Sequence, residues 1–339
     1  MNVHITGVGS ALPARKVTNE ELAKTIDTTD EWIVSHTGIH ARHVVGPDES
    51  TATLATCAAR LALAKAGVKA EELGLVIVTT STPDYGAFPS CACLVHRDIG
   101  AVNAGAFDLF AACTGFIYAL ETARSLMEHD PRPALVIGAD VMSRITDWKD
   151  RNTCVLFGDG AGAVVLQASE QPGGIRHSIL RADGNGYQAL HHEGGCRTPH
   201  TGPWMAAYIQ MHGRSVFNFA VKAFEEIVCD LVAREGITLN DVRWIVPHQA
   251  NVRIIEAAAR RLDTGLERFY INIGELANTS AATIPLALDQ MLREGKLEGR
   301  GTIILAGFGA GLTWGGTLIQ WNPPPPPAPA GVQALHPES

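Results

Sequence analysis

The sequence is poor in positive charge and in long apolar runs. Only 18% of its 339 residues are charged, Asp and Glu outnumber Lys and Arg by 35 to 27, and the formal net charge is −8. A nucleic-acid partner needs a basic surface that neutralises phosphates, so we expect none. No apolar run approaches the roughly 20 residues of a membrane-spanning helix, and residues 1–7 resemble a first strand and not a leader peptide. We therefore expect a cytoplasmic protein without membrane association.

The sequence also lacks a disulfide framework and a clear metal motif. Its seven cysteines are an odd number, scattered at positions 57, 91, 93, 113, 154, 196 and 229, which favours reduced thiols. A run of Gly158-x-Gly160-x-Gly162 leads into a strand and not into a helix, so we expect no dinucleotide cofactor. Possible zinc ligands lie in a stretch whose glycines and prolines indicate a loop, and we expect no metal. These residues are His191, His192, Glu193, Cys196 and His200.

A pattern of short apolar strands and helices occurs twice along the chain. The strands are predicted at 75–79, 106–110, 135–138 and 162–166, and again at 244–246, 269–273, 302–306 and 316–320. The helices are predicted at 51–66, 116–127, 216–234, 251–262 and 284–293. This alternation predicts an α/β protein with mostly parallel sheets covered on both faces. We expect two pseudo-dyad-related halves, 1–172 and 173–321, and a disordered proline-rich tail at 322–339.

Cys113 is the strongest candidate for a nucleophile. It follows the predicted strand at 106–110 and begins a predicted helix, whose positive N-terminal dipole should lower the pKa of the thiol. A single cysteine is more often an inert, buried apolar residue. His248 and Asn278, however, follow two strands of the second half, and α/β sheets bind ligands at the carboxyl ends of strands. We therefore expect these three distant side chains to converge.

These motifs resemble those of the thiolase-fold condensing enzymes, and most closely those of the β-ketoacyl-acyl-carrier-protein synthase III family. The resemblance extends from Gly7 to Trp314 and therefore covers everything except the tail. It rests on residues 30–34, 37–39, 88–90, 111–116, 150–151, 157–163, 247–251, 277–281, 307–311 and 313–315. The resemblance implies a thiolase-like fold, with two halves in a layered α/β/α/β/α core, and the start of type II fatty acid synthesis. Acyl-CoA and malonyl-acyl-carrier-protein would be substrates, with no cofactor.

The resemblance also implies a two-step reaction. The Cys113 thiolate attacks an acyl-CoA thioester, and the backbone N–H groups of Cys113 and Ala310 stabilise the oxyanion. A malonyl thioester then loses carbon dioxide, and His248 and Asn278 donate hydrogen bonds to the enolate oxygen, which a carboxylate would repel. The carbanion attacks the acyl group and releases a β-ketoacyl product. Whether His248 also deprotonates Cys113 is left open by the sequence.

Further residues are implicated in substrate and partner binding. The resemblance implies that Trp32 and Arg151 hold the CoA nucleotide, together with His36, which stands where relatives often have arginine and makes the charge pH-dependent. Phe88, contributed across a homodimer interface, and the loop 187–205 would shape the acyl pocket. The carrier protein would dock on one side of a predicted helix whose other side carries an apolar stripe. Its docking residues are Arg253, Arg260 and Arg261.

Three departures from the family pattern keep alternatives open. Besides His36, Ala277 and Ala310 stand where relatives usually have glycine, and alanine is strained if either position needs a positive φ. The leading hypothesis is the condensing enzyme that initiates fatty acid synthesis. A specialised relative that transfers or condenses the acyl group in secondary metabolism is the second, and a non-enzymatic acyl-binding relative is the third. Acetyl, short branched and medium-chain primers all remain possible.

Overall fold

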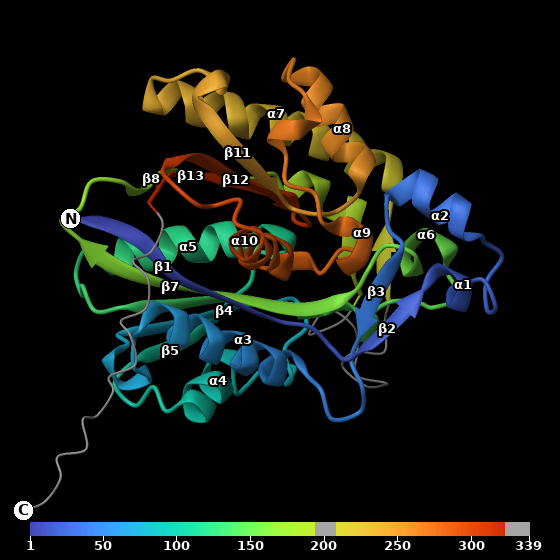
Figure 1. The fold of residues 1–339 in the computed structure, drawn as a ribbon. Helices are drawn as coiled ribbons and strands as arrows, with labels where there is room; N and C mark the ends of the chain where they lie inside the picture. The colour runs from blue at the N-terminus through green and yellow to red at the C-terminus, as the bar shows by residue number, and fades with distance from the viewer. Residues whose placement is uncertain (194–207, 323–339) are drawn as a thin grey trace, which may run out of the picture.

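The structure, a computed structural model, describes residues 1–193 and 208–322 and contains two mixed β-sheets (Figure 1). The first sheet has the strand order β1-β7-β6-β4-β5 and the second the order β11-β12-β13-β8. The strands of the first sheet are β1 (Asn2–Ala11), β4 (Leu75–Thr79), β5 (Gly105–Leu109), β6 (Ala134–Val141) and β7 (Asp159–Ser169). Those of the second are β8 (Gly174–Ala182), β11 (Val242–Pro247), β12 (Gly301–Gly309) and β13 (Thr313–Trp321).

Helices form three layers around these sheets, as Figure 1 shows. The helices α5 (Gly115–Leu126) and α10 (Thr283–Arg293) lie between the sheets and share one apolar core with both of them. The helices α3 (Thr51–Ala66) and α4 (Cys91–Ile99) cover the outer face of the first sheet. The helices α7 (Gly213–Glu235) and α8 (Val252–Arg261) cover the outer face of the second. The predicted α/β/α/β/α layering is therefore confirmed.

Helix α3 has the limits that the sequence predicts, because local signals set them, whereas α4 is not predicted and α7 begins earlier than expected. Helix α3 begins after Ser50, whose hydroxyl accepts a hydrogen bond from the Thr53 backbone, and ends at Gly67, whose φ is +66°. Helix α5 requires glycine at its first residue, since a Cβ on Gly115 would lie 1.8 Å from the Thr79 hydroxyl oxygen. This close approach brings the start of α5, and therefore Cys113, against the end of β4.

Two expectations about the sheets are wrong. Both sheets are mixed and not mostly parallel. In the first sheet β7 pairs in antiparallel fashion with β1 and with β6, and in the second β13 pairs in antiparallel fashion with β12 and with β8. The strand predicted at 269–273 is a single bridge between Phe269 and Ile245, after which the chain turns into α9 (Ile273–Leu276). The strands of the parallel pairs β4-β5, β4-β6 and β11-β12 still run in the same direction, and Cys113 and His248 follow the carboxyl ends of β5 and β11.

A smaller lobe packs beside the second sheet's strand ends and has an apolar core of its own. It contains β2 (Arg15–Thr18), α1 (Asn19–Leu22), α2 (Asp30–Thr37), β3 (Ala41–Val44), α6 (Arg151–Cys154), β9 (Leu190–His192) and β10 (Ile209–Met211). The sequence predicts none of its short strands. In the described part of the chain, no helix is long and apolar enough to cross a membrane.

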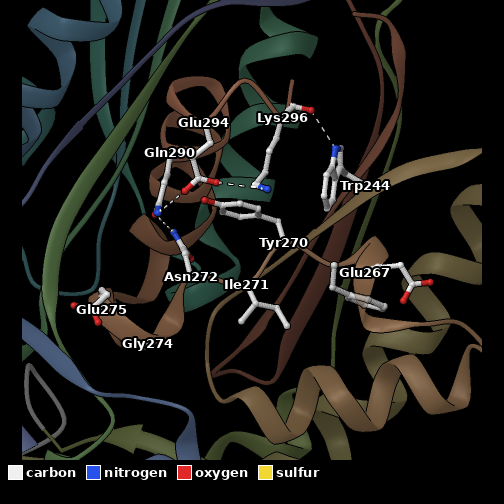
Figure 2. Close-up of a pocket in the computed structure, with 11 residues that line it drawn as sticks. Trp244, Glu267, Tyr270, Ile271, Asn272, Gly274, Glu275, Gln290, Glu294 and Lys296 are labelled. Carbon is white, nitrogen blue, oxygen red and sulfur yellow. Dashed lines mark hydrogen bonds and ion pairs between the residues drawn. The ribbon is translucent and has the colours of Figure 1, made fainter. Parts of the chain in front are cut away.

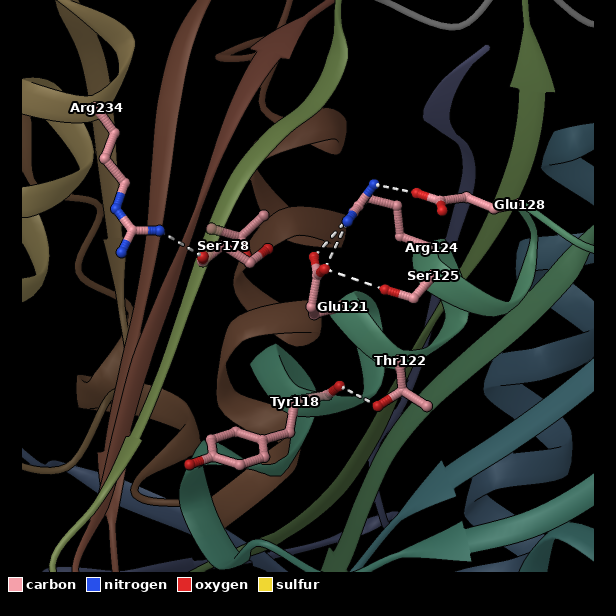
Figure 3. A network of polar contacts seen from close by, with 9 residues as sticks. Tyr118, Glu121, Thr122, Arg124, Ser125, Glu128, Ser178 and Arg234 are labelled. Carbon is pink, nitrogen blue, oxygen red and sulfur yellow. Dashed lines mark hydrogen bonds and ion pairs between the residues drawn. The ribbon is translucent and has the colours of Figure 1, made fainter.

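Polar contacts tie α5 of the first half to β8 of the second. The Tyr118 hydroxyl donates to the Arg181 carbonyl oxygen at 2.8 Å, and the Glu121 carboxylate accepts from Arg124 at 2.6 Å. In Figure 3, Glu121 lies between Arg124 and Ser178, and Arg234 of α7 reaches the Ser178 carbonyl from the other side. These contacts hold the helix that follows Cys113 against the half of the chain that carries His248 and Asn278.

Candidate active site

Cys113 lies in a 3₁₀ turn (Ala112–Thr114) between β5 and α5 and is 7% exposed. Its Sγ is 3.4 Å from the Ser280 Oγ. The end of β12 packs directly against it, because a Cβ on Gly309 would lie 2.9 Å from the Cys113 Cβ. The nucleophile is therefore enclosed by residues from both halves of the chain.

The expected thiolate is not present in the resting site. Burial raises the pKa of Cys113 to about 12, although a hydrogen bond with Ser280 lowers it in part. A helix N-terminus contributes only about 0.3–1 kcal/mol, which is less than one pKa unit, whereas full burial of a charge can shift a pKa by about 3–5 units. The raised pKa therefore favours a neutral Cys113 thiol.

His248 directly follows β11 and is 1% exposed. Burial lowers its pKa to about 3, so the imidazole is neutral. Its Nδ1 is 2.7 Å from the Thr283 hydroxyl, whose own proton is donated to the Ser280 carbonyl oxygen at 3.1 Å. With the hydroxyl in this orientation Nδ1 carries the imidazole proton and Nε2 the lone pair, an assignment made from the hydrogen bonds.

Asn278 follows α9 and is anchored at the backbone. Its N–H donates to the Leu156 carbonyl at 2.9 Å, and its carbonyl accepts from the Gly158 N–H at 3.0 Å. Its side-chain Oδ1 accepts from the Ser280 N–H at 2.9 Å, which orients the amide. The Nδ2 group has no hydrogen-bond partner among the described residues and can donate to a ligand.

Ala277, which precedes Asn278, has φ +58° and ψ −162°, a region that only glycine adopts easily. The position therefore does need a positive φ, and alanine is strained there. Ala310 differs, because it is not among the positive-φ residues of the described chain, so its side chain imposes no such strain. Its backbone N–H follows Gly309, the residue that touches Cys113.

One cavity of about 120 Å³ brings Cys113, His248 and Asn278 together. Its other walls are mainly apolar and include Phe157, Phe217 and Phe308. Two residues that the sequence did not single out, Ser280 and Thr283, bond to members of this set. They lie two and five residues after Asn278, but hydroxyl residues are so common in turns that sequence alone carries no specific signal.

The predicted nucleotide-binding residues form a separate cluster. The Arg151 guanidinium lies 4.8 Å from the Trp32 ring centroid, and the His36 ring stacks on Trp32 with centroids 4.3 Å apart. A cavity of about 280 Å³ beside them is lined by Arg151, Lys149 and residues 25–27. The Asn251 amide, which lines the catalytic cavity, donates to the His36 carbonyl at 3.1 Å and so links the two regions.

The remaining predicted site residues lie outside the cavity. Phe88 is 84% exposed and does not line the Cys113 cavity within this chain. Arg253, Arg260 and Arg261 are exposed on α8, opposite the buried stripe of Ile254, Ile255 and Ala258. Arg261 is paired with Glu225 at 2.6 Å.

The possible zinc ligands are described only in part, and a further cavity lies apart from Cys113. Cys196, His200 and much of the loop 187–205 lie outside the described residues, as does the tail from 323, and the rest of the chain has no group of three metal-ligating side chains. A cavity of about 450 Å³ lies between β11, α9 and α10 (Figure 2). Its lining includes Trp244, Tyr270 and Glu294 but neither cysteine nor histidine.

Comparison with known proteins agrees with the geometry. Residues 107–184 match the family 3-oxoacyl-[acyl-carrier-protein] synthase III, and residues 232–321 match the C-terminal part of the same enzyme. The β-ketoacyl-[acyl-carrier-protein] synthase III of Neisseria meningitidis is 47% identical over 321 residues, which cover 94% of this chain and 98% of the relative. The chain belongs to the β-ketoacyl-acyl-carrier-protein synthase III family.

Solved structures of the family share the fold. The 3-oxoacyl-[acyl-carrier-protein] synthase III of Aquifex aeolicus has a TM-score of 0.88 and 42% identity, covering 94% of this chain and all of that one. A priming β-ketosynthase from the R1128 polyketide pathway has a TM-score of 0.89 and 36% identity, covering 96% and 97%. The predicted thiolase-like fold is thus confirmed. So is the predicted acyltransferase, which condenses acyl-CoA with malonyl-carrier at the start of fatty acid synthesis.

Proposed function

We propose that the synthase reaction runs through Cys113, with His248 and Asn278 as its catalytic partners. The observation that carries this proposal is the single buried cavity that all three side chains line. In the first step Cys113 Sγ forms a bond to the acyl carbon and the CoA thiolate leaves. The Cys113 proton passes to the departing sulfur, and the His248 Nε2 lone pair is suited to carry it, since burial keeps this imidazole neutral.

The oxyanion of this step is assigned to the backbone N–H groups of Cys113 and Ala310. The contact between Gly309 and Cys113 supports this assignment, because it brings the loop after β12 next to the nucleophile. The ordinary φ of Ala310 also removes the objection that alanine would distort this loop.

In the second step malonyl-carrier loses carbon dioxide, and the enolate oxygen receives hydrogen bonds. Asn278 donates from Nδ2, whose orientation is set by the bond from Ser280 to Oδ1. His248 donates from Nε2 after its proton has exchanged through solvent from Nδ1 to Nε2, and the Thr283 hydroxyl then donates to Nδ1, which lies 2.7 Å away. The carbanion then attacks the acyl carbon, which releases β-ketoacyl-carrier and returns the sulfur to Cys113 as a thiolate.

We assign the CoA nucleotide to the Trp32, His36 and Arg151 cluster and the adjacent 280 Å³ cavity. The acidic carrier docks on the exposed arginines of α8, which begins four residues after His248. Arg253 and Arg260 supply most of the attraction, because the charge of Arg261 is already opposed by Glu225.

We further propose a cytoplasmic homodimer that joins through β5. This strand is an edge of the first sheet, and unpaired edges with exposed apolar side chains are sites of association. Phe107 and Phe110 are 36% and 76% exposed beside it. Pairing there lets Phe88 of the partner subunit complete the acyl pocket. The described cysteines are all unpaired, which fits a reducing compartment.

The experiment that tests the proposal is mass spectrometry of Cys113 after exposure to acetyl-, branched and medium-chain acyl-CoAs, followed by malonyl-carrier. We expect an acyl adduct on Cys113 that disappears as β-ketoacyl-carrier forms, and no adduct in Cys113→Ala. The likeness to the polyketide priming enzyme keeps one alternative, a role in secondary metabolism. An adduct that malonyl-carrier never consumes would favour that alternative.

A further inference from the structure

Ser280 contacts the catalytic set through three different groups. Its backbone N–H donates to Asn278 Oδ1 at 2.9 Å. Its carbonyl accepts from Thr283, which holds His248 Nδ1. Its hydroxyl oxygen lies 3.4 Å from Cys113 Sγ. A single residue, 1% exposed, therefore bonds to each catalytic side chain directly or through one hydroxyl.

The conformation of Ser280 makes these three contacts possible. Its φ is +52°, a left-handed value that costs a non-glycine residue about 1 kcal/mol or more. Such a backbone persists only where its surroundings hold it. Here the turn Ser280–Ala282 lies against β6, because a Cβ on Gly138 would be 2.3 Å from the Ala281 carbonyl oxygen.

Asp140, near the end of β6, forms a hydrogen bond to the same turn. This fully buried side chain accepts a hydrogen bond from the Ala281 N–H at 3.1 Å, and burial raises its pKa while the nearby Ser280 hydroxyl lowers that pKa in part. It also accepts from the Thr80 and Thr82 hydroxyls and from the Ser81 N–H. Because four other donors satisfy Asp140, the Ser280 hydroxyl can leave it at little cost.

The single hydroxyl proton of Ser280 has two possible acceptors. While Cys113 is a thiol, the Ser280 proton points to Asp140 and the S–H donates to Ser280 Oγ. When Cys113 loses its proton, the hydroxyl turns to Sγ, because a hydrogen bond to a charged acceptor is about twice as strong as a neutral one. The one covalent change is the loss of the Cys113 S–H proton, which passes to the departing CoA sulfur as proposed above.

We propose that Ser280 is the positioning residue of the catalytic set, and that its hydroxyl is the hydrogen-bond donor to the Cys113 thiolate as it forms and departs. This inference rests on the roles proposed above for Cys113, His248 and Asn278. It adds a residue that stabilises the nucleophile at the moment when burial opposes its charge.

The test is the pH profile of Cys113 alkylation by iodoacetamide, read by mass spectrometry in Ser280→Ala and in a matched control, Thr279→Val. Thr279 is the adjacent residue, equally buried, and its hydroxyl has no partner in the described part of the chain. We expect Ser280→Ala to react about tenfold more slowly at neutral pH, with its profile displaced to higher pH. Thr279→Val should follow the wild type. A wild-type profile in Ser280→Ala overturns the inference.

Ser280→Gly separates the hydroxyl from the backbone strain. Glycine relieves the positive φ but lacks the hydroxyl, so we expect the same alkylation deficit as in Ser280→Ala with a higher melting temperature. Wild-type alkylation in Ser280→Gly would assign the deficit to strain and overturn the inference. The two proposals can fail separately. If Cys113 alkylation depends on Ser280 but acyl-CoA never acylates Cys113, only the proposed function is refuted. If acyl-CoA acylates Cys113 but its alkylation does not depend on Ser280, only the present inference is refuted.

Discussion

The proposed reaction centre and the proposed nucleotide cluster are built in opposite ways. Cys113, His248 and Asn278 are at most 7% exposed and depend on a few buried hydrogen bonds. Trp32 and His36 are half-buried, and Arg151 is exposed, so their contacts are stacking interactions at the solvent boundary. Burial raises the cost of an unmade hydrogen bond and moves pKa values, whereas water screens the outer cluster. Substitutions should therefore have large effects at the centre and small ones outside it.

The largest effect is expected from Asn278→Asp. The carboxylate keeps an acceptor for the Ser280 N–H but has no donor for the enolate and repels its charge. We expect Cys113 acylation within a few-fold of wild type and malonyl-carrier decarboxylation reduced about 10²–10³-fold, the usual cost of an oxyanion donor. The measurements are adduct formation by mass spectrometry and carbon dioxide release. An equal loss in both steps would contradict the assigned role.

Thr283→Val should act next most strongly, through the tautomer of His248. Valine keeps the shape of threonine but removes the acceptor for the Nδ1 proton, so the proton moves to Nε2. We expect acylation to slow about tenfold, since the Nε2 lone pair is lost, and decarboxylation to fall less. Nitrogen-15 NMR of His248 reports the tautomer, and Thr283→Ser should restore the wild-type spectrum. An unchanged spectrum in the valine variant would refute the assignment.

The buried centre should also make stability depend on pH. Burial lowers the pKa of His248 from 6.5 to about 3 in the folded chain. Between these pH values the unfolded chain therefore binds a proton at His248 and the folded chain does not. The free energy of unfolding should fall as pH drops from 6.5 toward 3, and more steeply in wild type than in His248→Gln. At the alkaline end, the unfolded chain loses the Cys113 proton above pH 9.0 while the folded chain keeps it up to about pH 12. The free energy of unfolding should therefore fall between these pH values in wild type but not in Cys113→Ala. Urea unfolding at a series of pH values measures how the free energy of unfolding depends on pH at both ends. The same dependence in a variant and in wild type would contradict the burial of His248 or Cys113.

The two alanines at family glycine positions give a smaller and matched comparison. Ala277→Gly removes a strained positive φ, and we expect the free energy of unfolding to rise by about 1 kcal/mol. Ala310→Gly relieves no strain and should lower it by about 0.5–1 kcal/mol through the extra freedom of the unfolded chain. Urea unfolding of both variants decides the point. Equal changes would show that the backbone at Ala277 is not strained.

The smallest effect is expected at the nucleotide cluster. Trp32→Ala removes the ring that Arg151 and His36 stack on, and we expect the KM for acyl-CoA to rise about two- to fivefold while that for malonyl-carrier stays near wild type. Trp148→Ala, in the same lobe but bonded through Nε1 to the Ser143 carbonyl, is a control for general loss of packing. Equal KM changes for both substrates would exclude Trp32 from the CoA site.

Much of the architecture could be read from local signals. Helix α3 lies within the predicted 51–66, and β4 within 75–79, because capping residues and apolar runs act over a few residues. The strand at 269–273 failed for the opposite reason. Its apolar side chains suit a strand, but in the described chain its strand pairing is limited to the bridge between Phe269 and Ile245, and Asn272 caps a helix instead. Pairing partners come from distant parts of the chain, and local composition does not contain them.

The order of the motifs in the sequence alone determined the family of this chain and the three kinds of proposed reacting group, which are a thiol, an imidazole and an amide. Only the tertiary structure decided their states. It made Cys113 a neutral thiol, His248 a neutral imidazole with its proton on Nδ1, and Ser280 the residue that joins them. The physical reason is that desolvation and hydrogen-bond direction depend on atoms brought together from both halves, which no local run of residues specifies.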